Sequence, residues 1–71
     1  MNVEDAQAMH TEAIAAFKAA RKKFRAAASL FAASPSVKAW GDFEDEMYEV
    51  QAASNKVNYT REVLLTAQSR A

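Results

Sequence analysis

A seven-residue repeat of one large and one small side chain runs through the first half of this chain of 71 residues. The large column is His10, Phe17, Phe24 and Phe31, and the small column is Ala6, Ala13, Ala20 and Ala27. Because seven residues make nearly two turns of an α-helix, both columns lie along one stripe of a straight helix. The repeat therefore predicts a long helix that packs closely against another helix.

The length of the chain predicts a single domain, residues 1–71, which is near the lower size limit for an independent hydrophobic core. Proteins of this size usually add disulfides, a metal ion or oligomerisation. Cysteine is absent, so disulfides and thiolate metal sites are excluded, and one histidine is too few for an ordinary metal site. Oligomerisation, or docking on a larger partner, is the remaining route.

Ser34-Pro35-Ser36 is the one strong turn signal. Ser34 can act as a helix N-cap, and proline fits a first helical position. We therefore expect an all-α, antiparallel, coiled-coil-like hairpin with helices over 3–33 and 36–69 and a turn at 34–36; Asn2 suits the first N-cap. Gly41 either breaks the second helix, with Asp42 as a new N-cap, or lies within a continuous helix, which we favour.

The second helix also has an apolar stripe, in which the spacing alternates between three and four residues. Its members are Trp40, Phe43, Met47, Val50, Ser54, Val57, Arg61 and Leu64. Folding the chain back at the turn places Phe24 near Phe43 and Met47, and Phe31 near Val37 and Trp40. It also places Phe17 near Val50 and Ser54, and His10 near Val57 and Tyr59. The same register predicts that a basic run, Lys18, Arg21, Lys22 and Arg25, faces an acidic segment, Glu44, Asp45, Glu46 and Glu49.

Two helices alone do not cover the large side chains of these stripes on all sides. A second copy of the hairpin would complete a four-helix bundle, and a two-fold homodimer is the commonest arrangement for such a pair. A different protein could supply the missing helices instead. Tyr48 and Tyr59 lie off the stripe and either broaden a dimer core or contact a partner, because tyrosine is favoured at interfaces.

The sequence favours a protein without catalytic function, metal or cofactor. A nucleophilic triad has no basis without cysteine and with one histidine, and one glycine excludes a glycine-rich phosphate loop. We interpret the acidic segment as a solvated face rather than a metal or acid–base site. We interpret His10 as a packed histidine, with a pH-sensitive interface as the alternative. Without an apolar leader or a membrane-length stretch, we expect a cytoplasmic protein.

These patterns favour a protein-interaction module that acts through helix packing, such as an adaptor, assembly factor or inhibitor of the kind found among phage and plasmid accessory proteins. In size and in its alternation of small and large core residues, the chain resembles the Rop-type hairpins. That resemblance implies a dimeric bundle that binds RNA. In the alternative function, the basic run of this chain would contact RNA or DNA; it consists of Lys18, Arg21, Lys22, Lys23 and Arg25. The Pro-containing turn also resembles type III secretion needle subunits and their small chaperones. The formal net charge of zero argues against the nucleic-acid alternative.

Overall fold

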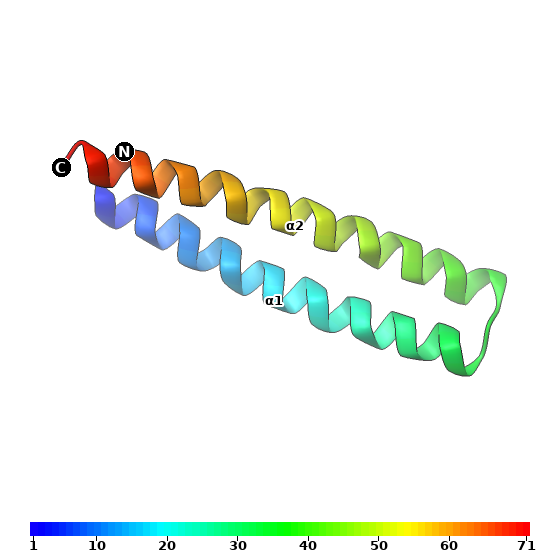
Figure 1. Cartoon of the computed structure of the whole chain (residues 1–71). Helices are drawn as coiled ribbons and strands as arrows, with labels where there is room; N and C mark the ends of the chain where they lie inside the picture. The colour runs from blue at the N-terminus through cyan, green and yellow to red at the C-terminus, as the bar shows by residue number, and fades with distance from the viewer.

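The computed structural model describes all 71 residues and shows an antiparallel pair of helices (Figure 1). α1 comprises Val3–Ala33 and α2 comprises Val37–Ser69. The hairpin measures 53 × 13 × 12 Å, and its radius of gyration is 16.0 Å. A compact domain of this length has a radius of gyration of about 11 Å. The predicted all-α hairpin is therefore confirmed, and it is an extended rod with little interior.

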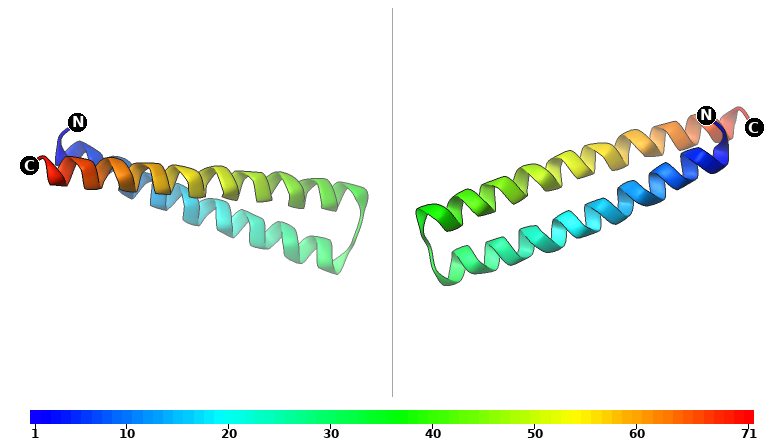
Figure 2. Two further views of the ribbon diagram at one scale, coloured as in Figure 1. Left: turned by 45° about the horizontal axis from the view of Figure 1, so that its top comes forward. Right: turned by 180° about the vertical axis from the view of Figure 1, so that it is seen from behind.

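The buried core is concentrated at the end of the rod that carries both termini. Five of the six buried residues lie there: Ala6, Ala13, Thr60, Leu64 and Ala67. Figures 1 and 2 show the two helices closest together at this end and further apart toward the turn. Small side chains allow the backbones to approach, whereas the phenylalanines that follow hold them apart. The half near the turn, residues 17–54, is called the turn half below.

Two columns of α2 face α1, and one of them differs from the sequence prediction. The large column, Phe43, Val50, Val57 and Leu64, is as predicted in position. The second column lies one residue earlier than predicted and consists of Ala39, Glu46, Ala53, Thr60 and Ala67, all buried or part-buried. The predicted members Trp40, Met47 and Arg61 are exposed, and Ser54 is part-buried at the edge. Four of these five side chains are small, and Glu46 is the one long member of the column.

The helix register follows from one polar contact between α1 and α2. His10 Nδ1 lies 2.9 Å from Thr60 Oγ1, one residue beyond the predicted neighbour Tyr59. Moving from this pair in opposite directions along the two helices, the register places Phe17 at the level of Ala53 and Val50 at the level of Ala20. Phe24 is the exception, because it lies at the level of the longer Glu46. The rest of the seam is a ladder of large-against-small layers.

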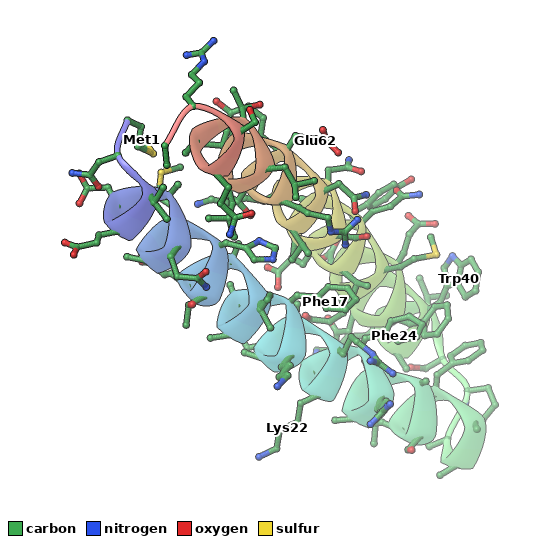
Figure 3. All side chains as sticks on the ribbon, turned by 60° about the vertical axis from the view of Figure 1, so that its left-hand side comes forward. Met1, Phe17, Lys22, Phe24, Trp40 and Glu62 are labelled. Atoms are coloured by element: carbon green, nitrogen blue, oxygen red, sulfur yellow. The ribbon has the colours of Figure 1, made fainter.

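The aromatic side chains of the turn half lie on one side of this seam. Figure 3 shows Phe17, Phe24 and Trp40 on the same side of the hairpin, whereas Lys22 projects from the outer side of α1. On each helix, the residue that directly follows a member of the small column projects to the same side as the large column. On α2, for example, Trp40 follows Ala39 and Met47 follows Glu46. The hairpin therefore has one aromatic side and one side lined mainly by alanine and charged residues.

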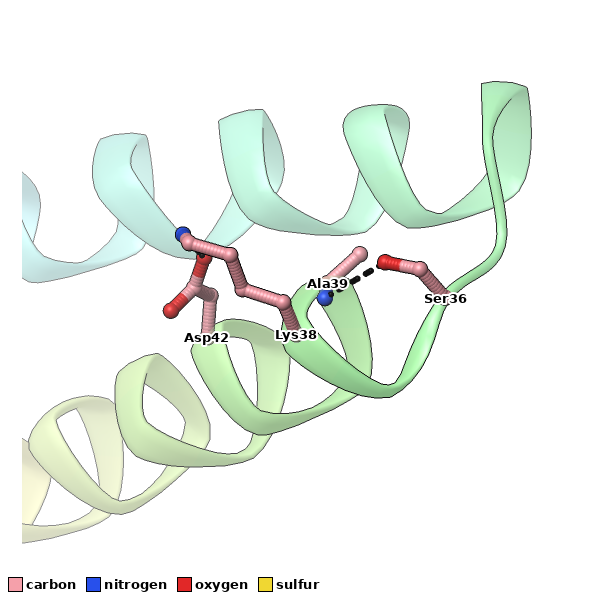
Figure 4. Close-up of polar contacts among 4 residues, drawn as sticks. All are labelled: Ser36, Lys38, Ala39 and Asp42. Carbon is pink, nitrogen blue, oxygen red and sulfur yellow. Dashed lines mark hydrogen bonds and ion pairs between the residues drawn. The ribbon is translucent and has the colours of Figure 1, made fainter.

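The turn corrects the predicted cap of the second helix. Ser36, in an extended conformation, is the N-cap of α2, and its hydroxyl accepts a hydrogen bond of 3.0 Å from the Ala39 N–H (Figure 4). Ser34 instead closes α1, because its N–H donates to the Leu30 carbonyl at 2.9 Å. The prediction that Ser34 caps α2 was wrong because α2 begins at Val37, so Pro35 lies between the two helices and not at the first position of α2. The predicted cap of α1 is confirmed: Asn2 Oδ1 accepts from the Asp5 N–H at 2.7 Å.

Gly41 lies inside α2, which continues through it without a break. A methyl group at its Cα would meet no atom within 4 Å, and its φ is not positive. Neither close packing nor an unusual backbone conformation therefore requires glycine here.

We predict that Gly41→Ala stabilises the hairpin by about 0.5–1 kcal/mol, because alanine has less backbone entropy to lose on forming a helix. Urea unfolding followed by circular dichroism measures the change. Ala52→Gly, at an exposed position of α2, is the matched control and should lower stability by a similar amount. A Gly41→Ala variant that is less stable than the wild-type chain would contradict the open space around this position.

Candidate interaction face

Four aromatic rings in the turn half form one continuous cluster across the two helices. The ring centroids of Phe24 and Phe43 are 5.1 Å apart, and those of Phe31 and Trp40 are 5.6 Å apart. Phe43 links the two pairs, at 6.1 Å from Phe31 and 5.7 Å from Trp40. The predicted pairs Phe24–Phe43 and Phe31–Trp40 are confirmed. These distances are typical of favourable aromatic contacts.

This cluster is only partly covered by the hairpin itself. Trp40 is 49 % exposed and Met47 is 39 % exposed, while the phenylalanines are part-buried. The Arg21 guanidinium lies 5.6 Å from the centre of the Phe17 ring, within the range of a cation–π contact. We call this surface the aromatic face; it consists of Phe17, Phe24, Phe31, Trp40, Phe43 and Met47. A contiguous apolar surface of this kind is typical of a binding site.

The charged runs of α1 and α2 do not pair with each other. The single ion pair of the hairpin lies within α2, where Lys38 Nζ is 2.9 Å from Asp42 Oδ2 (Figure 4). The predicted pairing was therefore wrong for the basic residues Lys18, Arg21, Lys22 and Arg25 and the acidic residues Glu44, Asp45, Glu46 and Glu49. Arg25 borders the aromatic face, whereas Glu49 lies across the seam from that face, so these two charges project to different sides of the hairpin.

The side opposite the aromatic face has a different chemistry. A shallow groove there is lined by Lys23, Ala26, Ala27, Leu30, Asp42, Asp45 and Glu46. Lys23 is the one cation of the basic run that borders this acidic side. Leu30 is exposed at its edge. This groove mixes opposite charges with short apolar side chains, in contrast to the aromatic face.

The terminal half of the seam contains a polar link between the helices. Thr60, fully buried, donates its hydroxyl proton to the Val57 carbonyl at 3.1 Å. The same hydroxyl oxygen is therefore an acceptor toward His10, which requires the proton of the neutral imidazole to be on Nδ1. His10 was predicted to pack in the seam; the hydrogen bond gives it a specific partner and orients its ring.

Glu46 is the one charged residue in the small column of α2. Its Oε2 atom is shielded from solvent and has no hydrogen-bond partner, although the side chain as a whole is only part-buried. Desolvation raises the pKa of this carboxyl above its ordinary value of 4.5, as does the neighbouring Glu49 carboxylate. Lys23 opposes the rise in pKa. An acid at a packed position weakens the seam when it is ionised.

The two tyrosines that were predicted as partner contacts do not belong to the aromatic cluster. Tyr48 and Tyr59 are exposed and lie outside the aromatic face. The His, Asp and Glu side chains form no group of three or more able to hold a metal ion. Neither helix has an apolar stretch long enough to cross a lipid bilayer.

No protein family, characterised protein or solved structure matched this chain.

Sequence reasoning missed the small column of α2. Its members are Ala39, Glu46, Ala53, Thr60 and Ala67. Hydrophobicity favours the neighbouring Trp40 and Met47 for a buried position, so a search for apolar residues selects the wrong column. A signal was present, because alanine or threonine recurs at seven-residue or fourteen-residue intervals, as the alanines of α1 do.

We predict that Glu46→Gln removes part of the pH dependence of stability. The carboxyl binds its proton more tightly in the folded hairpin than in the unfolded chain. Its contribution to the free energy of unfolding is therefore fully present below pH 4.5, and it is lost as the pH rises through the raised pKa of the folded state. The wild-type chain should therefore lose more stability than Glu46→Gln between acid and neutral pH. Urea unfolding over this range measures the difference.

Glu62→Gln is the matched control, because Glu62 is exposed and lies outside the seam. It should follow the wild-type pH profile. Identical profiles for Glu46→Gln and the wild-type chain would contradict the desolvated position of this carboxyl.

Proposed function

We propose that this hairpin is a protein-interaction module without catalytic activity and that its aromatic face docks on a second copy of the chain. Docking of two copies would form a dimeric four-helix bundle, which fits the role of an adaptor, assembly factor or inhibitor. The exposed, contiguous aromatic cluster of the turn half carries the proposal. Surface area and core size each support a second copy as the occupant.

The first support is the exposed area of the single hairpin. Its accessible surface is 5219 Å². A compact protein of 7.8 kDa exposes about 4400 Å². The excess of about 800 Å² equals the area that each partner buries in a protein–protein interface of standard size. Covering one side of the rod with an identical rod would remove an area of this size.

The second support is the small core of the isolated hairpin. The buried apolar residues number five, and four of them are alanines: Ala6, Ala13, Ala39, Ala67 and, as the one large side chain, Leu64. Alanine contributes little hydrophobic area, whereas a buried phenylalanine contributes about 1.5–3 kcal/mol. The aromatic face adds two exposed apolar side chains, Trp40 and Met47, to its part-buried phenylalanines, and burying them would enlarge this core. Dimerisation would therefore supply the stability that one hairpin lacks.

We predict that Trp40→Lys converts the dimer to monomers. Tryptophan at the centre of an interface typically contributes 2 kcal/mol or more, which corresponds to a dissociation constant weakened roughly 30-fold. Sedimentation equilibrium over a range of concentrations measures the change. Tyr59→Lys is the matched control, because Tyr59 is an exposed aromatic residue outside the aromatic face, and it should dimerise like the wild-type chain.

A folded wild-type monomer at high micromolar concentration would overturn the proposed dimer. Equal weakening by Trp40→Lys and Tyr59→Lys would place the interface elsewhere on the rod.

A second candidate function is nucleic-acid binding through the basic run of α1. All five side chains, Lys18, Arg21, Lys22, Lys23 and Arg25, are exposed, and none forms an ion pair within the hairpin. The adjacent acidic residues of α2 and the zero net charge oppose this function.

For this second function we predict a mobility shift of RNA or DNA that weakens steeply with salt and is lost in Lys22→Glu/Lys23→Glu. Phosphate contacts produce this salt dependence through counterion release. An absent or salt-independent shift would remove nucleic acid as a partner.

A further inference from the structure

We infer that the two copies stack with their turns at the same end, so that α1 of each copy lies along α2 of the other. This inference rests on the proposed dimer and adds its orientation. Two faces of a rod can meet around a two-fold axis parallel to the helices or around one that crosses them. Only the parallel axis brings both turns together, and it pairs every helix with an antiparallel neighbour.

The distribution of apolar area along the rod is the first argument. The exposed apolar members of the aromatic face, Trp40 and Met47, lie in the turn half. The same side of the terminal half is mainly polar: Gln7, Arg61 and Gln68 are exposed there, and Leu65 is the one exposed apolar side chain that borders it. A fully overlapped, head-to-tail pair would place the aromatic cluster of one copy on these polar residues. Coverage of the aromatic face therefore requires the two turn halves to lie on each other.

The distribution of charge selects between the two arrangements that overlap the turn halves. In this half, every charged residue of α1 is basic and every charged residue of α2 except Lys38 is acidic. With the axis across the helices, α1 would lie on α1 and α2 on α2, so charges of one sign would face each other. With the axis along the helices, the basic α1 of each copy lies along the acidic α2 of the other.

One specific contact follows from this orientation. Arg25 and Glu44 each directly follow a phenylalanine of the large column, so both border the aromatic face. Neither has an ion-pair partner within its own hairpin. They lie at nearly the same level of the rod, because Phe24 and Phe43 are in contact. Stacking with the turns at one end brings Arg25 of one copy opposite Glu44 of the other, twice in each dimer.

Distances between spin labels test the orientation in the full-length chain, which has no cysteine of its own. Ser34→Cys places a label at the turn, and Ser69→Cys places one at the end of α2; both positions are exposed. We expect each variant to give a label-to-label distance of about 20–30 Å, because neighbouring helix axes in a bundle lie about 10 Å apart. A crossed axis would separate the Ser69 labels by at least the rod length of 53 Å.

The outcomes separate the inference from the proposed function. Short distances at both positions support the shared orientation. A dimer in which the Ser69 labels are far apart overturns the orientation and retains the dimer. Absence of dipolar coupling in a monomeric sample overturns both.

Charge reversal tests the contact between copies. Arg25→Glu and Glu44→Arg should each weaken dimerisation by about tenfold, because two pairs are lost in every dimer. An equimolar mixture of the two variants should regain wild-type affinity, since the oppositely reversed chains complement each other. Rescue only when both changes are in the same chain would assign the pair to a single hairpin, and a mixture tighter than wild type would indicate the crossed axis. Either result would overturn the orientation.

Discussion

The close approach of the two helices at their terminal end is the constraint on which the other features of the hairpin depend. It is possible because Ala6, Ala13 and Thr60 occupy the space between the backbones, and all three are buried. Where small residues lie directly between the two backbones, the large residues pack beside them, at the flanks of the helix pair. The position of the aromatic side chains on one side of the rod is a consequence of this packing.

The same packing explains why the hairpin has an unused apolar surface. A ladder of large-against-small layers joins two helices efficiently, but it leaves one flank of each large side chain uncovered. In the terminal half that flank is bordered mainly by polar residues, with Leu65 as the exception, whereas in the turn half it continues into Trp40 and Met47. The proposed dimer and its orientation follow from this difference between the two halves.

Two polar residues interrupt the seam and have different consequences. His10 and Thr60 satisfy each other by a hydrogen bond, so the pair specifies one register at little cost in stability. Glu46 has a shielded oxygen without a partner, and its ionisation opposes folding. A polar residue at a packed position is best known for selecting one helix alignment over another. Glu46 would have that role in the bundle if its carboxylate gained a partner there.

The sequence by itself determined the two helices, the antiparallel hairpin, the Asn2 cap and the pairs Phe24–Phe43 and Phe31–Trp40, because a seven-residue repeat and a proline-containing turn are local patterns. The tertiary structure decided the small column of α2, the Ser36 cap and the absence of ion pairs between helices. These depend on how closely two backbones approach and on which side of the seam each charge projects. Hydrophobicity alone ranks tryptophan above alanine for burial, but the space between the helices admits only the smaller side chain.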